Sequence, residues 1–321
     1  SVSSLKSLIT VVISFLDFNT SNSLSTPSEF ILPNPDKSLK TSYKEMESIQ
    51  KELTALVFKK YLNKFDIENG KIVFTNKNLR LIDEVDTIFE MFAKKYSKNI
   101  FKNVGLNMLD MVVYSEDYFK KFGNKALTFR KIEGKLNTIS NRIGISKDGQ
   151  LIKGSYLDRL ATAPKFKEEL KDYVAKGLSE NITLKEFQNG FLDLIEGSKD
   201  VDGAMLRYWK METHDAFFSV SRAQDDLFSQ KLGMEFFIYL PGKIDKTRPF
   251  CEEKIGKCFH RLDAEKWRDK EWAGKNKGYN PLINMGGYNC RHSPAWVSNL
   301  VVKKRFPEKY KEYESILNDK V

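Results

Sequence analysis

Hydrophobic side chains recur at spacings of three and four along most of the chain beyond residue 40, which is the period of an amphipathic helix. Several capping and stop signals accompany this pattern, among them Pro164, the capping box Thr183-Leu184-Lys185-Glu186 and Gly233. The pattern predicts helices over 43–65, 78–98, 128–143, from Pro164, from Thr183, over 202–232 and over 307–321, with 100–122 as a further helix or a broken pair.

Alternating, β-rich runs are few and short. Asn69-Gly70 between Phe65 and Phe74 predicts a tight hairpin, and a second small hairpin is expected over Ile145–Ile152. Met234–Leu240 is aromatic-rich and is followed by Pro241-Gly242, which is typical of a strand end. The sequence therefore predicts an α+β fold, in which a predominantly helical N-terminal region precedes a small mixed, loop-rich module that contains the Cys and His residues.

Residues 1–40 differ from the rest in composition. Pro27, Pro33 and Pro35 exclude a helix there, so we expect an extended arm. The apolar run Leu8–Leu16 is about half the length that a membrane-spanning helix needs. No convincing cleavage site follows it, which favours a docked arm or strand over a signal peptide. We expect no membrane contact, and a division into the arm at 1–40, a helical domain at 41–200 and the module at 201–321.

The charge balance leaves the choice of partner open. The 321 residues contain 53 Lys and Arg against 43 Asp and Glu, a formal net charge of +10. An acidic partner such as nucleic acid is compatible with this charge. However, the Lys-Lys pairs are spread along the chain and are flanked by acids, which is more typical of a solvated surface than of a dedicated groove.

One stretch, Asp245–His292, concentrates the residues that carry chemistry: all three cysteines and two of the three histidines lie within it. Zinc prefers thiolate and imidazole ligands and takes four of them in structural sites. The candidate ligands are Cys251, Cys258, His260, Cys290 and His292. Two alternatives remain open: buried reduced core cysteines that can also form a disulfide, and a nucleophilic set of Cys251 with His260 or His292 and Asp245.

The remaining polar residues of the stretch suit a structural role. Asp245 and Thr247 are expected to bind backbone N–H groups in a turn. Arg248 is expected to pair with a carboxylate such as Glu212 on the long helix. Asn289 and Gly286-Gly287 suit a tight turn with positive φ.

Taken together, these motifs resemble a known family. The motifs are Glu212-Thr213 on a helix, Asp245-x-Thr247-Arg248-Pro249-x-Cys251 after a strand, Gly256-Lys257, and Asn289-Cys290-Arg291-His292. Over about residues 205–297 the chain resembles the minor head proteins of tailed bacteriophages related to the F protein of phage Mu, often called phage head morphogenesis proteins. The family has a histidine upstream of Asn-Cys-Arg, and Met285-Gly286-Gly287-Tyr288 stands there instead. Cys258 or His260 is the expected substitute in a metal site.

The resemblance implies a non-enzymatic virion protein that is associated with the portal or the inner capsid and aids head morphogenesis or genome delivery. Its expected partners are portal and major capsid proteins, with contact to packaged double-stranded DNA. It would be found in the head interior or portal region of the particle, and in the host cytoplasm during assembly. The alternatives are a zinc-stapled nucleic-acid-binding protein and a nuclease-type toxin.

Overall fold

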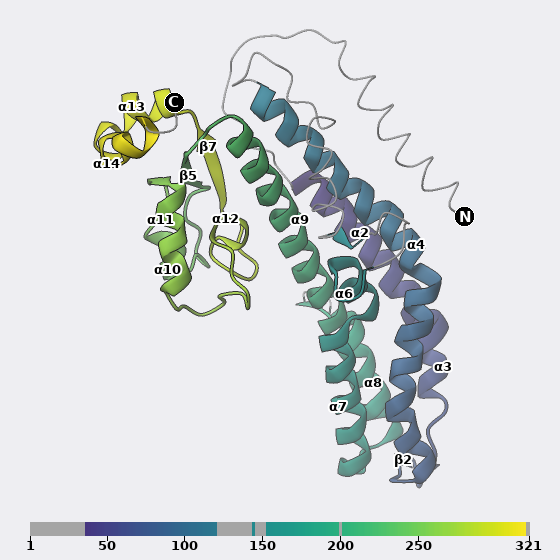
Figure 1. Cartoon of the computed structure of the whole chain (residues 1–321). Helices are drawn as coiled ribbons and strands as arrows, with labels where there is room; N and C mark the ends of the chain where they lie inside the picture. Colours follow the sequence, from purple (N-terminus) through teal and green to yellow (C-terminus); the bar gives the residue numbers. More distant parts are fainter. Residues whose placement is uncertain (1–35, 121–142, 145–151, 199–200, 319–321) are drawn as a thin grey trace. The chain divides into compact units, whose positions relative to one another are not determined.

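The computed structural model describes residues 36–120, 143–144, 152–198 and 201–318 (Figure 1). The described chain is dominated by helices and carries three small antiparallel sheets, so the expected α+β fold class is confirmed. It forms two compact units. We call them the helical unit, with described residues 36–107, 152–198 and 201–214, and the sheet unit, with described residues 108–120, 143–144 and 215–318. The division within the C-terminal half falls at Asp215.

The helical unit is formed by consecutive helices and two short hairpins. Its elements are α2 (Asp36–Leu53), the π-helical turn η2 (Thr54–Phe58), α3 (Lys59–Leu62), β1 (Ile67–Glu68), β2 (Lys71–Ile72), the first part of α4 (Asn76–Lys120), α6 (Tyr156–Thr162), α7 (Pro164–Glu180), α8 (Leu184–Glu196), β3 (Gly197–Ser198), β4 (Val201–Asp202) and the start of α9 (Ala204–Lys231). The helix α2 begins at Asp36, inside the segment expected to be an extended arm.

Local signals placed several of these elements correctly. The β1–β2 hairpin turns at Asn69-Gly70, where both residues have positive φ, 50° and 76°. Pro164 is the first residue of α7. Thr183 and Glu186 form the capping box of α8, in which each side chain accepts the other residue's backbone N–H. Gly233, at φ 63°, follows the end of α9.

Helix α4 differs from the expectation of two separate helices. It runs unbroken over 45 residues, Asn76–Lys120. This segment contains no proline and only one glycine, Gly105. A single internal glycine costs about 1 kcal/mol of helix stability and does not end a helix. The helix boundary that was expected between Lys98 and Ile100 is therefore absent, and the helix continues through Asn99.

Aromatic side chains fill the core of the helical unit. The ring centroids of Phe58 and Phe191 are 5.6 Å apart, and those of Phe65 and Phe187 are 4.8 Å apart. In α9, Trp209 stacks on Phe92 at 5.6 Å. Its indole N–H donates to the carbonyl of Leu160 at 3.0 Å. This hydrogen bond satisfies the one polar group of a buried tryptophan.

The sheet unit surrounds a three-stranded antiparallel sheet with the strand order β6-β5-β7. Its elements are the end of α4, the main part of α9, β5 (Phe236–Leu240), α10 (Pro249–Glu252), β6 (Cys258–His260), α11 (Arg261–Glu265), the 3-10 turn η4 (Lys266–Asp269), α12 (Pro281–Asn284), β7 (Ser293–Val297), α13 (Asn299–Arg305) and α14 (Pro307–Asn318). The expected strand over Met234–Leu240 and the expected C-terminal helix are both present.

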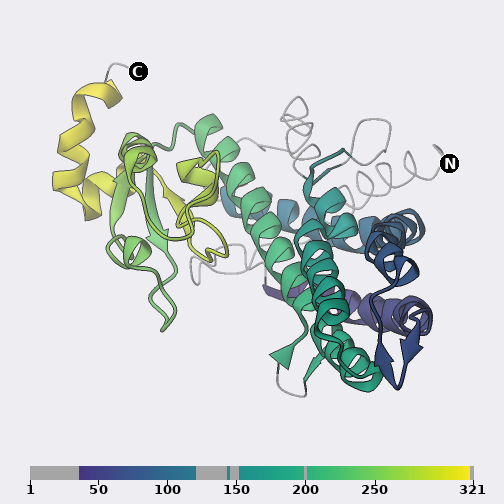
Figure 2. The same cartoon turned by 90° about the horizontal axis from the view of Figure 1, so that it is seen from below.

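The two faces of this sheet carry separate cores. Side chains alternate between the faces along a strand. Phe237 and Tyr239 of β5 pack in a larger core with residues of α9, α10, α11 and α12. Phe236 and Ile238 pack in a smaller core with residues of α13 and α14. Figure 2 gives a second view of the strands and of the two C-terminal helices, drawn in yellow.

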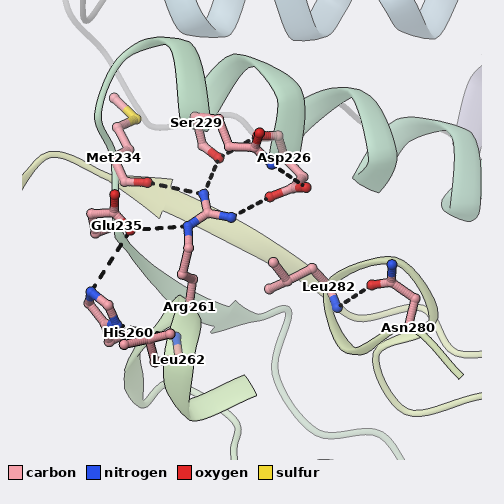
Figure 3. Close-up of polar contacts among 10 residues, drawn as sticks. Asp226, Ser229, Met234, Glu235, His260, Arg261, Leu262, Asn280 and Leu282 are labelled. Atoms are coloured by element: carbon pink, nitrogen blue, oxygen red, sulfur yellow. Dashed lines mark hydrogen bonds and ion pairs between the residues drawn. The ribbon is translucent and has the colours of Figure 1, made fainter. Parts of the chain in front are cut away.

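Arg261 ties the sheet to α9 (Figure 3). Its guanidinium donates to Asp226 at 2.9 Å, to Glu235 at 3.1 Å and to the Ser229 hydroxyl at 3.1 Å. It also lies over the ring of Trp296, with its Cζ 4.6 Å from the centroid. The two carboxylates are mostly buried, and this guanidinium is the cation that they share. Asp226 also accepts a hydrogen bond from Gln230 at 2.9 Å, and Glu235 Oε2 lies 3.9 Å from His260 Nε2.

Four expectations fall largely on residues outside the described ranges: the extended arm over 1–40, the apolar run Leu8–Leu16, the helix over 128–143 and the hairpin over 145–152. Among the described helices, none combines the length and the apolar composition that crossing a bilayer requires.

Candidate metal centre

Cys251 reaches the larger core from a turn that follows β5. In this turn the Thr247 hydroxyl accepts the backbone N–H of Ile244 at 2.8 Å, as its place in the sequence predicted. Pro249 then opens the short helix α10, which places Cys251 in the core with 2% of its surface exposed. The neighbouring backbone is fixed to β5, since Gly256 N–H donates to the carbonyl of Tyr239 at 2.9 Å.

Cys290 follows a tight turn after α12. Gly287 and Asn289 have positive φ values of 93° and 54°, as expected for this turn. The Asp215 carboxylate accepts the backbone N–H of Asn289 at 2.5 Å, which ties the turn to α9. Cys290 itself is 3% exposed.

His292 directly precedes β7 and is 3% exposed. Its ring lies against Tyr239 of the neighbouring strand, with the centroids 5.0 Å apart. The pairing of β5 with β7 sets this contact, because Tyr239 stands opposite Pro294 in the register.

The three side chains form a cluster with the dimensions of a metal site. The ligand atoms of Cys251, Cys290 and His292 all lie within 4.8 Å of one another. Cys290 Sγ is 3.6 Å from His292 Nδ1. Zn–S and Zn–N bonds of about 2.3 and 2.0 Å give a tetrahedral site sulfur-to-nitrogen edges of about 3.5 Å. These residues could therefore hold a metal ion with little rearrangement.

Neighbouring groups favour the ionised form of one of the two sulfurs, that of Cys290, which is the form that binds a cation. The hydrogen bond from Cys251, the contact with His292 and the charge of Arg222 hold the pKa of Cys290 well below its ordinary value. The hydrogen bond with Cys290 and burial raise the pKa of Cys251. The backbone N–H of Gly286 also donates to Cys290 Sγ, at 3.2 Å. Both sulfurs bind a metal as thiolates, so metal binding would release any proton that the pair holds.

Arg222 lies next to the cluster and is 3% exposed. Its guanidinium donates to the carbonyl of Ile283 at 2.9 Å and to the carbonyl of Cys290. Both acceptors are neutral carbonyl groups, so these bonds fix the backbone of the site without neutralising the guanidinium.

Cys258 and His260 do not join the cluster, which corrects two of the five expected ligands. Both lie on β6, opposite Ile238 and Phe236, and so face the smaller core on the other side of the sheet. Burial there raises the pKa of Cys258 to about 11. His260 stacks on Tyr313 at 4.1 Å, and its Nδ1 accepts the backbone N–H of Leu262. The nucleophilic set of Cys251 with His260 is separated by the same sheet.

Arg248 and Glu212, the expected pair, belong to different units, and each has a partner within its own unit. Glu212 pairs with Arg159 in the helical unit, at 3.0 Å. Arg248 donates to the carbonyl of Tyr288 at 2.6 Å and so joins the Cys251 turn to the Cys290 turn. Every residue has a backbone carbonyl, so the sequence could not indicate that Tyr288 would be the partner of Arg248.

The other motif residues serve the local structure. Thr213 is fully buried, donates to the carbonyl of Trp209 at 2.7 Å and accepts the hydroxyl of Tyr156 at 2.9 Å. Arg291 donates to the carbonyl of Gly242. Asp245 is exposed in the turn before α10.

Sequence reasoning missed three residues that shape the site: Tyr239, Arg222 and Gly286. Tyr239 and Arg222 looked like ordinary positions of a strand and a helix. Gly286 was assigned to a turn with positive φ, whereas its importance is steric. A Cβ atom at Gly286 would overlap Cys251 Sγ and lie 2.9 Å from Cys290 Sγ.

Comparison of the chain with protein-family models, with curated proteins and with solved structures gives no match.

Proposed function

We propose that this chain is a non-enzymatic structural protein of a tailed-bacteriophage virion, a minor head protein that contacts portal or capsid proteins and aids head assembly or genome delivery. The proposal joins the motif resemblance to one structural observation. Cys251 and Cys290, which belong to two separate motifs, meet with His292 in a single cluster whose members are only 2–3% exposed.

Burial of the cluster supports a structural role over a catalytic one. A catalytic cysteine sits in a partially exposed environment where a substrate can reach it, whereas buried cysteines are inert. Here the cluster lies inside an aromatic core that includes Phe250, Trp267 and Tyr279. Its ligands come from three segments: α10, the turn after α12 and the start of β7. An ion held there would join these segments as a disulfide would.

Zinc is the ion that we propose for this site. Two cysteines and a histidine are borderline-soft ligands, a set that zinc shares with few other available metals. A structural zinc contributes directly to the free energy of folding of a small, loop-rich region. The sheet unit fits this description, because long loops separate its short strands.

The virion assignment is tested in particles. Intact phage purified by density gradient should contain this chain together with portal and capsid proteins, at a constant ratio across the particle peak. Mass spectrometry of the fractions measures that ratio. A chain that is absent from both finished particles and assembling proheads would contradict the proposal.

A basic charge balance adds contact with packaged DNA to the proposal. The last turn of α13 carries Lys303, Lys304 and Arg305. Binding that depends on such residues weakens steeply as salt rises. The purified protein should therefore bind double-stranded DNA weakly and lose that binding with salt. Tight, base-specific binding would favour the nucleic-acid-binding alternative instead.

A further inference from the structure

The proposed metal centre has three protein ligands of the Cys and His type within the described residues, and a closed structural zinc site needs four. We propose that the hydroxyl of Tyr239 is the fourth ligand, giving a Cys251–Cys290–His292–Tyr239 site. This inference rests on the proposed metal centre and names the group that completes it. Cys258 and His260 cannot do so, because the sheet places them on its opposite face.

Tyr239 is positioned to contact the other ligands. It lies at the centre of the sheet unit on β5, and its side chain is fully buried. Its ring contacts that of His292 at 5.0 Å between centroids. Its hydroxyl is close enough to Cys251 to share a hydrogen bond with that sulfur. The tyrosine thus contacts two of the three other ligands.

The donor atoms of three of these residues lie beside Gly286. The position that a Cβ atom would take there lies 2.9 Å from Cys290 Sγ and 3.5 Å from Tyr239 Oη, and it overlaps Cys251 Sγ. Three potential donor atoms therefore lie close to one another, and the residue beside them has no side chain. An ion with donor distances of about 2.0–2.3 Å would lie among these atoms on the side away from Gly286, because the Cβ position is within bonding distance of Gly286 Cα.

The hydroxyl of Tyr239 also lacks a good hydrogen-bond partner. Among the described residues, Tyr239 Oη has no nitrogen or oxygen partner. Sulfur is a weak hydrogen-bond partner, and an unsatisfied buried hydroxyl costs free energy. By contrast, the hydroxyl of Tyr279 in the same core donates to the carbonyl of Met285 at 2.6 Å. Coordination to an ion would satisfy Tyr239 in a way that the protein atoms do not.

Charge balance agrees with an anionic fourth ligand. Two thiolates and one phenolate around a divalent ion leave a net charge of −1. The guanidinium of Arg222 is buried beside the site, where its hydrogen bonds go to neutral carbonyl groups. A buried charge is costly without a compensating partner. Arg222 is also attracted to the Asp215 carboxylate, and the four-ligand site would add a second counter-charge beside this guanidinium.

The test is a metal titration of the full-length apoprotein under reducing conditions, with zinc and then cobalt(II). The wild-type protein should bind one ion and develop the ultraviolet difference band of one ionised tyrosine per bound ion. Tyr239→Phe should still bind one ion, at least about tenfold more weakly, without the tyrosinate band and with an altered cobalt spectrum. Tyr279→Phe is the matched control, and should behave like the wild type.

The outcomes separate this inference from the one on which it depends. Metal bound by the wild type without a tyrosinate band, or with the same spectrum and affinity in Tyr239→Phe, overturns Tyr239 as a ligand and leaves the Cys–Cys–His centre standing. A wild-type protein that binds no ion overturns the metal centre and this inference together. If Tyr239→Phe does not fold, the tyrosinate band of the wild type and of Tyr279→Phe still decides the question.

Discussion

Phe236 and Phe237 are consecutive residues of β5, yet their rings belong to different cores on opposite faces of the sheet. Phe236 packs against Tyr313 of α14 at 6.1 Å, and Phe237 packs against Trp296 of β7 at 5.3 Å. The same alternation places Cys258 with Phe236 and places Tyr239 with Phe237. Which cysteines and histidines can meet is therefore decided by strand register.

The two faces should respond differently to loss of a cysteine. We expect about one zinc per chain in the wild-type protein purified under reducing conditions. Cys290→Ala should lose the zinc and melt at a lower temperature, because it removes a ligand. Cys258→Ala should retain the zinc, because Cys258 lies in the smaller core. Elemental analysis and thermal melting measure both effects. Equal zinc content in the two variants would contradict the assignment of ligands.

Gly286 should not tolerate a side chain. Gly286→Ala places a methyl group against the sulfurs of Cys251 and Cys290, and overpacking of this kind costs about 1–3 kcal/mol. It should also abolish metal binding. The control is Gly242→Ala, since a Cβ there would meet no atom within 4 Å. Denaturant unfolding compares the two. A stable, metal-binding Gly286→Ala protein would show that the space beside the sulfurs is not needed.

Removal of Arg261 should destabilise the sheet unit. Arg261→Ala leaves the mostly buried carboxylates of Asp226 and Glu235 without their shared cation, at a cost of roughly 2–3 kcal/mol. Lys243→Ala is a matched control, because the pair of Lys243 and Glu252 is about half exposed and worth less than about 1 kcal/mol. Chemical denaturation of both variants gives the comparison. Similar losses in the two would refute a special role for Arg261.

Asp263 should make stability dependent on acid pH. Burial alone would raise the pKa of its carboxyl, but hydrogen bonds from Lys309, Tyr313 and the backbone N–H of His260 outweigh it and lower the pKa. A lowered folded-state pKa stabilises the protein above the unfolded value of about 3.9, and that stabilisation is lost as the pH falls through the folded value.

Asp263→Asn tests this pH dependence. The variant should be less stable than the wild type at neutral pH by about 1–3 kcal/mol. The difference should narrow as the pH falls below about 3.9, through the unfolded value and then the lowered folded value of the wild-type carboxyl. Melting temperatures of both proteins between neutral and acid pH give the measurement. A difference that stays constant down to the most acid pH would show that the Asp263 carboxylate is not the group responsible.

The sequence by itself determined the features that depend on near neighbours in the chain. Asn69-Gly70 fixed a hairpin and Pro164 opened a helix. Thr183 with Glu186 capped another helix, and Gly233 followed the end of a third. Each of these residues either adopts a particular φ more readily than other residues do or satisfies a backbone N–H within four residues, so its effect can be read locally. The α+β class followed from the same periodicities.

Only the tertiary structure decided which residues form the candidate site. Five ligands looked equivalent in the sequence, but a shift of one residue in strand register moves a side chain to the other face. The pairing of β5 with β6 and β7 therefore put Cys258 and His260 on one face, and Cys251, Cys290 and His292 on the other with Tyr239. Arg248 donates to the backbone carbonyl of Tyr288, a partner that lies 40 residues away in the chain. Register and packing join residues distant in the chain, and spacing along the chain does not encode those contacts.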